Sequence, residues 1–186
     1  MAIRTLQKNT QALYFVTFTC YNWLPLIEKT KLYDNIYEWF RNLFSKNIRI
    51  CGYVIMPNHI HLLIFLPLES AELRIVIGNA KRFMAYEIVK RLKDDKLLDF
   101  LENSVPAQER KKGKIHNIFK ASYDAKECYS EAFILQKLNY MHKNPVSGKW
   151  NLAETYTDYQ HSSARFYELN KTDYEFEITN YMEIAL

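Results

Sequence analysis

Two histidines spaced one residue apart are the sharpest chemical feature of the sequence. His59 and His61 flank Ile60 and follow Pro57-Asn58 directly. In a β-strand alternate side chains point to opposite faces, so both imidazoles would lie on one face while Ile60 enters the core. Two adjacent imidazoles make half of a metal site. Two histidines on a partly solvated sheet face are also a common chance pattern, so the pair alone leaves both interpretations open.

A tyrosine and an asparagine close to Pro145 form a second constellation. Apolar residues at 134, 138 and 141 predict the buried stripe of a helix, whereas Gln136, Tyr140 and Asn144 fall on a different i, i+4 column. Tyr140 is therefore either an ordinary interface residue or a phenol presented to a bound molecule. Proline biases the preceding residue away from α geometry, so the place of Asn144 one turn beyond Tyr140 is approximate.

The elements that must position these residues follow from hydrophobic periodicity. Residues 13–20 are rich in β-branched and aromatic side chains and predict a first strand. An amphipathic stripe begins after Thr30, which we expect to cap the helix, and runs to about Lys46. Two β-type runs at 48–56 and 59–66, separated by the turn-forming Pro57-Asn58, predict a tight antiparallel hairpin.

The second half of the chain completes the pattern. A helical stripe spans 73–92, with Lys81 and Arg91 off it and available to solvent or a ligand. Residues 94–114 are mostly charged or polar and predict an irregular, mobile insertion. We expect a fourth strand at 115–123 and a third helix from Ser130 to the residue before Pro145.

The resulting βαββαβα order is typical of the ferredoxin-like α+β class, an antiparallel sheet with helices packed on one face. The chain of 186 residues and 22.3 kDa fits a single domain over residues 1–186, with a core at about 13–167. Its 48% hydrophobic and 25% charged residues exclude a disordered or fibrous protein.

Charge is distributed unevenly along the chain. Residues 171–186 hold one lysine and four carboxylates, a net charge of −3. Since the whole chain has a net charge of +4, residues 1–170 have a net charge of +7. Basic residues gather at Lys81, Arg82, Lys90, Arg91 and Lys93, and again at Arg110, Lys111, Lys112, Lys114 and Lys120. Such clusters can follow a phosphate backbone, with aromatic residues nearby to stack on bases. Solvated helix faces and a basic loop explain the charges equally well.

Cysteine usage and hydropathy bear on the compartment. The three cysteines are widely spaced and contain no CxxC motif, which argues against a disulfide framework and a zinc ribbon. The first residues lack the apolar core of a signal peptide, and the longest apolar run, at 62–66, is too short to span a bilayer. We therefore expect a cytoplasmic protein with no membrane partner.

Three segments in this order resemble a known family. They are Val54-Ile55-Met56-Pro57-Asn58-His59-Ile60-His61-Leu62-Leu63, then Lys81-Arg82-Phe83 on a helix, then Tyr140-Met141-His142-Lys143-Asn144-Pro145-Val146. Their combination resembles the small single-tyrosine HUH transposases of the insertion-sequence-200-like superfamily, and more narrowly the REP-associated tyrosine transposases. The later run Tyr159-Gln160-His161-Ser162-Ser163-Ala164-Arg165 is also similar, and the resemblance covers about residues 13–167.

The resemblance implies an activity and a site. His59 and His61 would be the metal ligands, Asn144 a third ligand, and Tyr140 the nucleophile. Members of this family use Mg²⁺ or Mn²⁺ to cleave and rejoin single-stranded DNA at hairpin or palindromic repeats through a 5′-phosphotyrosine intermediate, as monomers or homodimers. The basic clusters, of which Lys81 and Arg82 alone belong to the matching motifs, predict DNA contacts at Lys81, Arg82, Arg110, Lys111, Lys112, Lys114, Lys120 and Tyr123. Close relatives in the family more often have asparagine where this chain has Lys143, a position outside the proposed catalytic set.

Two alternatives remain at this stage. The first is a nucleic-acid-binding module of the same fold that has lost catalysis, although neither a ligand nor the nucleophile is missing. The second is an unrelated HxH metalloenzyme built on a turn-rich barrel. The chain has only four glycines and long amphipathic helices, which argue against such a barrel. Tyr123 is a rival nucleophile, and the Asn-Pro context favours Tyr140.

Overall fold

The computed structural model describes residues 11–93, 95–172 and 174–184. The leaderless start expected at residues 1–10 and the tail carboxylate Asp173 lie outside these residues. Within the described part of the chain, no helix is both long and apolar enough to cross a bilayer.

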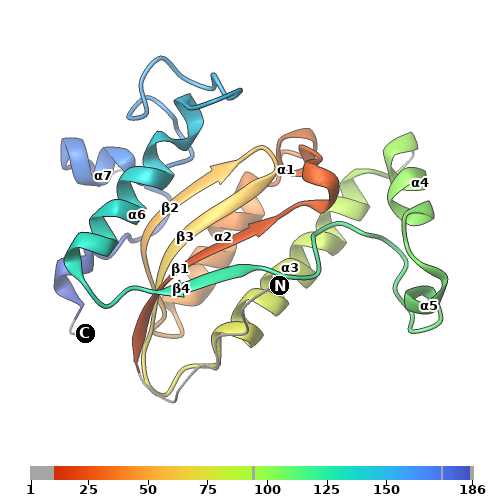
Figure 1. Ribbon diagram of the computed structural model, residues 1–186, viewed down its shortest axis with the longest axis horizontal. Helices are drawn as coiled ribbons and strands as arrows, with labels where there is room; N and C mark the ends of the chain where they lie inside the picture. The colour runs from red at the N-terminus through yellow and green to blue at the C-terminus, as the bar shows by residue number, and fades with distance from the viewer. Residues whose placement is uncertain (1–10, 94, 173, 185–186) are drawn as a thin grey trace.

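A four-stranded antiparallel sheet forms the centre of the protein (Figure 1). Its strands are β1 (Ala12–Thr19), β2 (Arg49–Met56), β3 (His59–Leu66) and β4 (Asp124–Glu127), in the order β2-β3-β1-β4. The Pro57-Asn58 turn joins β2 to β3 as expected. The register sets Thr17 opposite His61 and Thr19 opposite His59, so the two central strands carry the candidate site.

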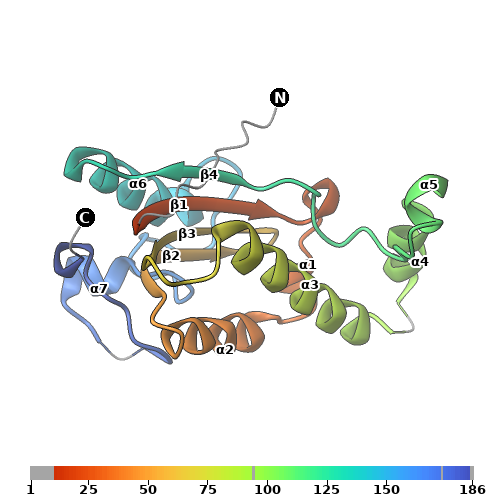
Figure 2. The ribbon, with the colours of Figure 1, turned by 90° about the horizontal axis from the view of Figure 1, so that it is seen from below.

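Two long helices cover one face of the sheet, seen below it in Figure 2. They are α2 (Tyr33–Phe44) and α3 (Leu73–Arg91), and their buried stripes pack against the side chains of Tyr14, Val16 and Phe18. These three residues alternate along β1, so they point to the same face. This layer forms the larger of two hydrophobic clusters.

The opposite face carries α6 (Glu131–Lys143), which corrects the expectation of helices on one face alone. Ile134, Leu138 and Met141 pack there against alternate residues of β1, β2 and β3. The physical reason is that β2 and β3 are apolar on both faces, and each face must be covered. Gly52 lets α6 approach closely, since a Cβ at this position would lie 2.7 Å from Leu138 Cδ2.

The start of α2 differs from the prediction. Thr30 does not cap it; its hydroxyl donates to the carbonyl of Leu26 at 2.7 Å and thereby ends the short helix α1 (Leu26–Lys29). Arg91, expected to be available, instead donates to Asp34, Asn35 and Glu87 and to the carbonyls of Thr30 and Lys31.

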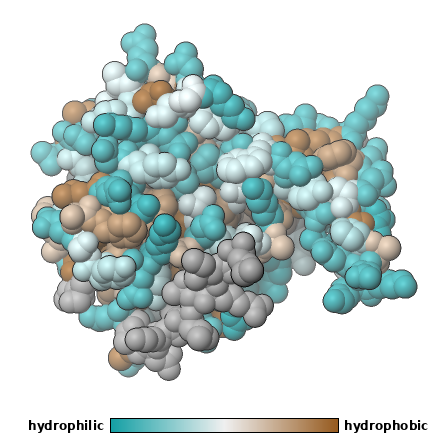
Figure 3. All heavy atoms as spheres, in the orientation of Figure 1, coloured by the Kyte–Doolittle hydropathy of each residue, from teal (hydrophilic) through white to brown (hydrophobic). Residues whose placement is uncertain are grey.

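The segment between α3 and β4 also differs. Residues 94–114 were expected to be irregular, yet they contain α4 (Lys96–Asn103), capped by Asp95, and α5 (Ala107–Arg110). Together these helices form a lobe that stands out from the body, with hydrophilic side chains at its tip (Figure 3). Residues 115–123 are not a strand; Phe119 makes one isolated bridge to Cys20, and β4 begins only at Asp124.

The C-terminal third closes the sheet edge at β2. Residues 161–163 run beside it, with hydrogen bonds from Ile55 N to His161 O (2.9 Å) and from Ser163 N to Tyr53 O (3.0 Å). Such cover removes an exposed edge that would otherwise pair with another chain. Beyond α7 (Ala164–Leu169), the acidic extension buries Phe176, Ile178 and Tyr181 against the body. Three 3₁₀ turns complete the described elements: Tyr21–Trp23, Asn144–Val146 and Tyr181–Glu183.

Candidate active site

The two histidines of β3 lie side by side on the face covered by α6, while Ile60 enters the opposite core as predicted. Each ring is fixed through its Nδ1 atom. His59 Nδ1 is 2.7 Å from Asn58 Oδ1, and His61 Nδ1 is 2.7 Å from Thr17 Oγ1. The Asn58 amide oxygen can only accept, so His59 Nδ1 carries the proton and Nε2 keeps its lone pair; the Thr17 hydroxyl orients the His61 ring. Ligating imidazoles are usually held by such a contact at the second nitrogen.

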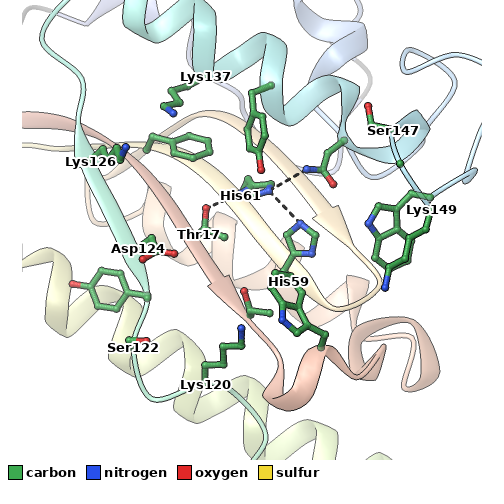
Figure 4. A pocket seen from close by; sticks show the side chains of 18 residues that line it. Thr17, His59, His61, Lys120, Ser122, Asp124, Lys126, Lys137, Ser147 and Lys149 are labelled. Atoms are coloured by element: carbon green, nitrogen blue, oxygen red, sulfur yellow. Dashed lines mark hydrogen bonds between the residues drawn. The ribbon is translucent and has the colours of Figure 1, made fainter. Parts of the chain in front are cut away.

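The two Nε2 atoms converge on one point and lie 3.1 Å apart (Figure 4). Two donors about 2.1 Å from a cation and at right angles to each other would be about 3.0 Å apart. Burial lowers the pKa of His59 to about 4, and burial with the charges of His59 and Lys137 lowers the pKa of His61 to about 3. Both imidazoles are therefore neutral at pH 7, the form that binds metals.

Asn144 supplies a third neutral donor. Its Nδ2 lies 3.4 Å from His61 Nε2, and turning the amide about χ2 presents Oδ1 to the same point. The backbone of Asn144 is helical (φ −55°, ψ −43°), so the bias imposed by Pro145 is overridden and Asn144 lies one turn beyond Tyr140. The chain continues helically into a 3₁₀ turn at Asn144–Val146, which keeps the amide over the sheet.

His59, His61 and Asn144 thus form a set of two imidazoles and one amide that fits a divalent cation. Within the residues that the structure describes, no cluster of three His, Cys, Asp or Glu side chains is suited to a metal. A site built on this set carries no ligand charge, so it would leave the cation's full charge for an anionic substrate. Open coordination positions would face the cavity that these residues line.

Tyr140 presents its phenol from α6 to the same cavity. The side chain is 53% exposed, and its ring lies edge-on to His61 with centroids 5.3 Å apart. Phe15 packs against both His61 and Tyr140. Lys137, one turn earlier on α6, holds its ammonium 5.9 Å from the Tyr140 ring centroid. A potential nucleophile, a cation and three neutral ligands therefore meet at one place.

The cavity around them has a volume of about 690 Å³ and is open to solvent. Among the described residues that line it are four lysines, Lys120, Lys126, Lys137 and Lys149, and one carboxylate, Asp124. Figure 4 shows these lysines spread around the two histidines. Five aromatic residues complete the wall: Phe15, Trp23, Tyr123, Tyr140 and Trp150. A basic cavity with aromatic walls suits a strand of nucleotides.

The predicted DNA contacts divide into two groups. Lys120 and Tyr123 line the cavity. Lys81 instead donates to the carbonyls of Lys120, Ala121 and Ser122 at 2.6, 3.0 and 3.2 Å, and burial lowers its pKa to about 8. It therefore anchors the segment that carries Lys120.

The remaining basic residues lie away from the cavity lining. Arg82 is exposed on α3 with its guanidinium 4.9 Å from the Phe83 ring centroid. Arg110 donates to the carbonyls of Val105 and Glu102 within the lobe, and Lys114 pairs with Glu109 at 2.7 Å. Lys111 and Lys112 are exposed at the lobe tip. None of these residues is among those that line the cavity.

Several residues of the site were missed by the sequence analysis. Asn58 and Thr17 orient the imidazoles, and Thr17 becomes visible only once the β1–β3 register is known. Lys137 lies one turn before Tyr140, a spacing that a helical projection would have shown. Trp23 ends a three-residue 3₁₀ turn and Lys149 lies in a loop, and segments this short carry no periodic signal.

Comparisons with known proteins bear on the fold. No protein-family model matches the chain, and no curated protein matches it. Among solved structures, a REP-associated tyrosine transposase bound to a REP hairpin matches with a TM-score of 0.61 at 13% identity, over 97% of this chain and 94% of that one. A putative transposase from Deinococcus radiodurans R1 also matches, with a TM-score of 0.34 at 13% identity over 77% of this chain and 95% of its own. The chain therefore has the fold of a REP-associated tyrosine transposase, as the resemblance predicted.

Proposed function

We propose that the protein is a metal-dependent transposase that cleaves and rejoins single-stranded DNA through Tyr140. The observation that carries this proposal is the meeting of an exposed phenol with two converging imidazoles in a basic cavity, the Tyr140 and His61 ring centroids lying 5.3 Å apart. The fold shared with a hairpin-bound transposase supports the proposal.

His59, His61 and Asn144 would hold Mg²⁺ or Mn²⁺. Bound there, the ion would withdraw charge from the oxygens of a scissile phosphate and orient them. Asn58 and Thr17 keep both Nε2 lone pairs directed at the ion by engaging the Nδ1 atoms. The neutral state of both imidazoles at pH 7 follows from their burial.

Tyr140 performs the covalent chemistry. Its Oη attacks phosphorus, the bond from phosphorus to the 3′-oxygen breaks, and the phenolic proton ends on the departing 3′-hydroxyl through solvent. The phosphotyrosine link conserves the energy of the phosphodiester, so attack by another 3′-hydroxyl reverses the step and frees the phenol. The Lys137 ammonium, 5.9 Å from the Tyr140 ring centroid, brings a positive charge close to the reacting groups.

The lysines of the cavity are suited to hold the strand. Lys120, Lys126, Lys137 and Lys149 surround the histidines on different sides. They offer several phosphates a contact at once, which gives binding that weakens with salt. We extend to this chain the hairpin substrate that is bound in the matched structure, and place the hairpin's single-stranded flank in the cavity.

The test is trapping of the covalent intermediate. A labelled pool of single-stranded hairpin oligonucleotides is incubated with the protein and Mn²⁺, resolved on a denaturing gel, and any adduct is mapped to its peptide. We expect an adduct on Tyr140 that disappears with EDTA and in Tyr140→Phe. Tyr123→Phe is the matched control, since Tyr123 is the rival nucleophile and lines the same cavity; this variant should form the adduct within about twofold of wild type.

An adduct mapped to Tyr123, or one that persists in EDTA, would contradict the assignment. Tight binding of the pool without an adduct under any divalent metal would instead favour a module that binds nucleic acid without cleaving it.

A further inference from the structure

A tryptophan stands exposed at the rim of the cavity, beside the first metal ligand. Trp23 is 53% exposed although indole is largely apolar, and it lines the same cavity as His59. Its ring meets the His59 imidazole edge-on, with centroids 5.8 Å apart. A large aromatic side chain at a basic cavity, left uncovered by the fold, is a typical site for stacking on a ligand.

The backbone under this side chain is held in an unfavourable conformation. Asn22 and Trp23 both have positive φ, 50° and 57°, consecutively and without glycine. For a bulky residue the left-handed region is an outlier, which persists only where surrounding contacts impose it and is concentrated at functional sites. With this backbone the indole stays exposed and lines the cavity instead of entering the core.

One side chain ties Trp23 to the metal ligand. The amide of Asn58 donates from Nδ2 to the Trp23 carbonyl at 2.8 Å, while its Oδ1 contacts His59 Nδ1 at 2.7 Å. A single residue therefore sets the positions of the exposed indole and of the imidazole relative to each other.

A lysine completes the arrangement. The Lys120 ammonium lies 4.1 Å from the centroid of the Trp23 ring, over the ring face. Its backbone is fixed from two sides, since Lys120 N donates to the Thr19 carbonyl at 2.9 Å and Lys120 O accepts from Lys81 at 2.6 Å. An exposed aromatic ring and a lysine whose backbone is held next to it match a nucleotide, which offers a base to stack and a phosphate to pair.

We propose that Trp23 and Lys120 form a nucleotide subsite next to the scissile phosphate, in which the indole stacks on a base of single-stranded DNA and the ammonium contacts the adjoining phosphate. The subsite deepens the proposed function, on which it rests for its substrate. Its role is to fix the strand relative to His59, so Trp23 is a positioning residue.

The test separates base from backbone. Binding of a fluorescein-labelled dT₁₂ and of a 12-mer of abasic deoxyribose is measured by anisotropy, in EDTA so that no cleavage intervenes. Trp23→Ala should lower the affinity for dT₁₂ about tenfold and leave the affinity for the abasic oligomer unchanged, because only dT₁₂ has bases to stack. Trp23→Phe should restore most of the affinity, and Phe100→Ala, a similarly exposed aromatic outside the cavity lining, should bind both like wild type.

Lys120→Gln should weaken both oligomers alike and lower the salt dependence, the slope of log K against log salt falling by about 0.7. The subsite is overturned if Trp23→Ala binds dT₁₂ as tightly as wild type, or if its affinities for dT₁₂ and for the abasic oligomer fall equally. Tyr140→Phe distinguishes the two proposals. If Tyr140→Phe abolishes the adduct but Trp23→Ala binds dT₁₂ like wild type, the proposed function stands and the subsite fails. If the wild-type protein forms no adduct but Trp23→Ala loses affinity for dT₁₂ alone, the subsite stands and the proposed function fails.

Discussion

Burial, complete for His59, His61 and His142 and partial for His161, lowers the pKa of four histidines: to about 4 for His59, about 3 for His61, and about 4 for both His142 and His161. The first two lie side by side on β3, and the last two belong to the C-terminal third of the chain. Their partners differ. His142 Nε2 is 2.8 Å from Ser163 Oγ, and His161 Nδ1 is 2.8 Å from the Tyr37 hydroxyl. His161 is also stacked on Tyr33, with centroids 3.6 Å apart.

The first pair leaves one lone pair of each ring directed at the other across 3.1 Å, at the floor of a cavity. The second pair uses its nitrogens to join the C-terminal segment to the body, and neither ring lines the cavity. Burial and a lowered pKa are thus common to the proposed metal ligands and to the two histidines that bond within the fold. Convergence of free lone pairs on an open space is what separates them.

The largest effect is expected from removing a proposed metal ligand. His59→Ala or His61→Ala should lower the rate of adduct formation about a thousandfold, since a metal contributes several kcal/mol to the stabilisation of charge on phosphoryl oxygens. The rate is measured with the hairpin pool and Mn²⁺, with circular dichroism to confirm that the variants are folded. Near-normal rates in either variant would break the distinction between the pairs.

The structural pair should respond in stability instead. His142→Ala removes a buried ring and leaves Ser163 without that partner, which should lower the free energy of unfolding by about 2–3 kcal/mol. Urea denaturation measures the loss, and the adduct rate is compared per folded molecule. A stable variant with a much lower rate would place His142 in the catalytic set.

A smaller effect is expected from the residues that orient the ligands. Thr17→Val keeps the shape but removes the hydroxyl at His61 Nδ1, and should weaken Mn²⁺ binding about 10- to 100-fold. Thr30→Val is the matched control, because its hydroxyl bonds only the Leu26 carbonyl in α1. Titration calorimetry compares the two, and equal affinities would show that the Thr17 contact does not tune the ligand.

The fold was predictable where periodicity carries information. The hairpin of β2 and β3, α3 and α6 all appear close to their expected bounds, and Ser130 caps α6 as predicted. Periodicity shows which side of a helix is buried but not which face of the sheet it covers, so the placement of α6 on the second face was missed. Apolar Ile118 and Phe119 suggested a strand, but they are buried as an irregular segment while the more polar 124–127 pairs with β1.

The candidate site was predictable to the extent that its residues share an element. Alternation places His59 with His61, and the i, i+4 spacing places Tyr140 with Asn144, but neither relation says that the two pairs meet. That requires α6 to lie over β1 and β3. Trp23 depends on a left-handed backbone at a non-glycine residue, which no local sequence preference indicates.

The smallest effect concerns pH. The pKa of His161 is about 4 in the folded protein against about 6.5 unfolded, so the unfolded chain binds the extra proton between these values. Stability therefore falls as the pH drops from about 6.5 towards 4. His161→Gln should flatten this decline, measured as the difference in urea midpoint between pH 7 and pH 4.5. An unchanged difference would show that His161 does not contribute to acid sensitivity.

The most direct test of the account is to locate the metal. Crystals of Tyr140→Phe with a bound hairpin oligonucleotide are soaked in Mn²⁺, and anomalous scattering is measured at a wavelength where manganese dominates. We expect one peak bonded to the Nε2 atoms of His59 and His61 and to the Asn144 amide oxygen, at about 2.0–2.3 Å from each. A peak at His142 or His161, or none at His59 and His61 with the oligonucleotide in place, would contradict it.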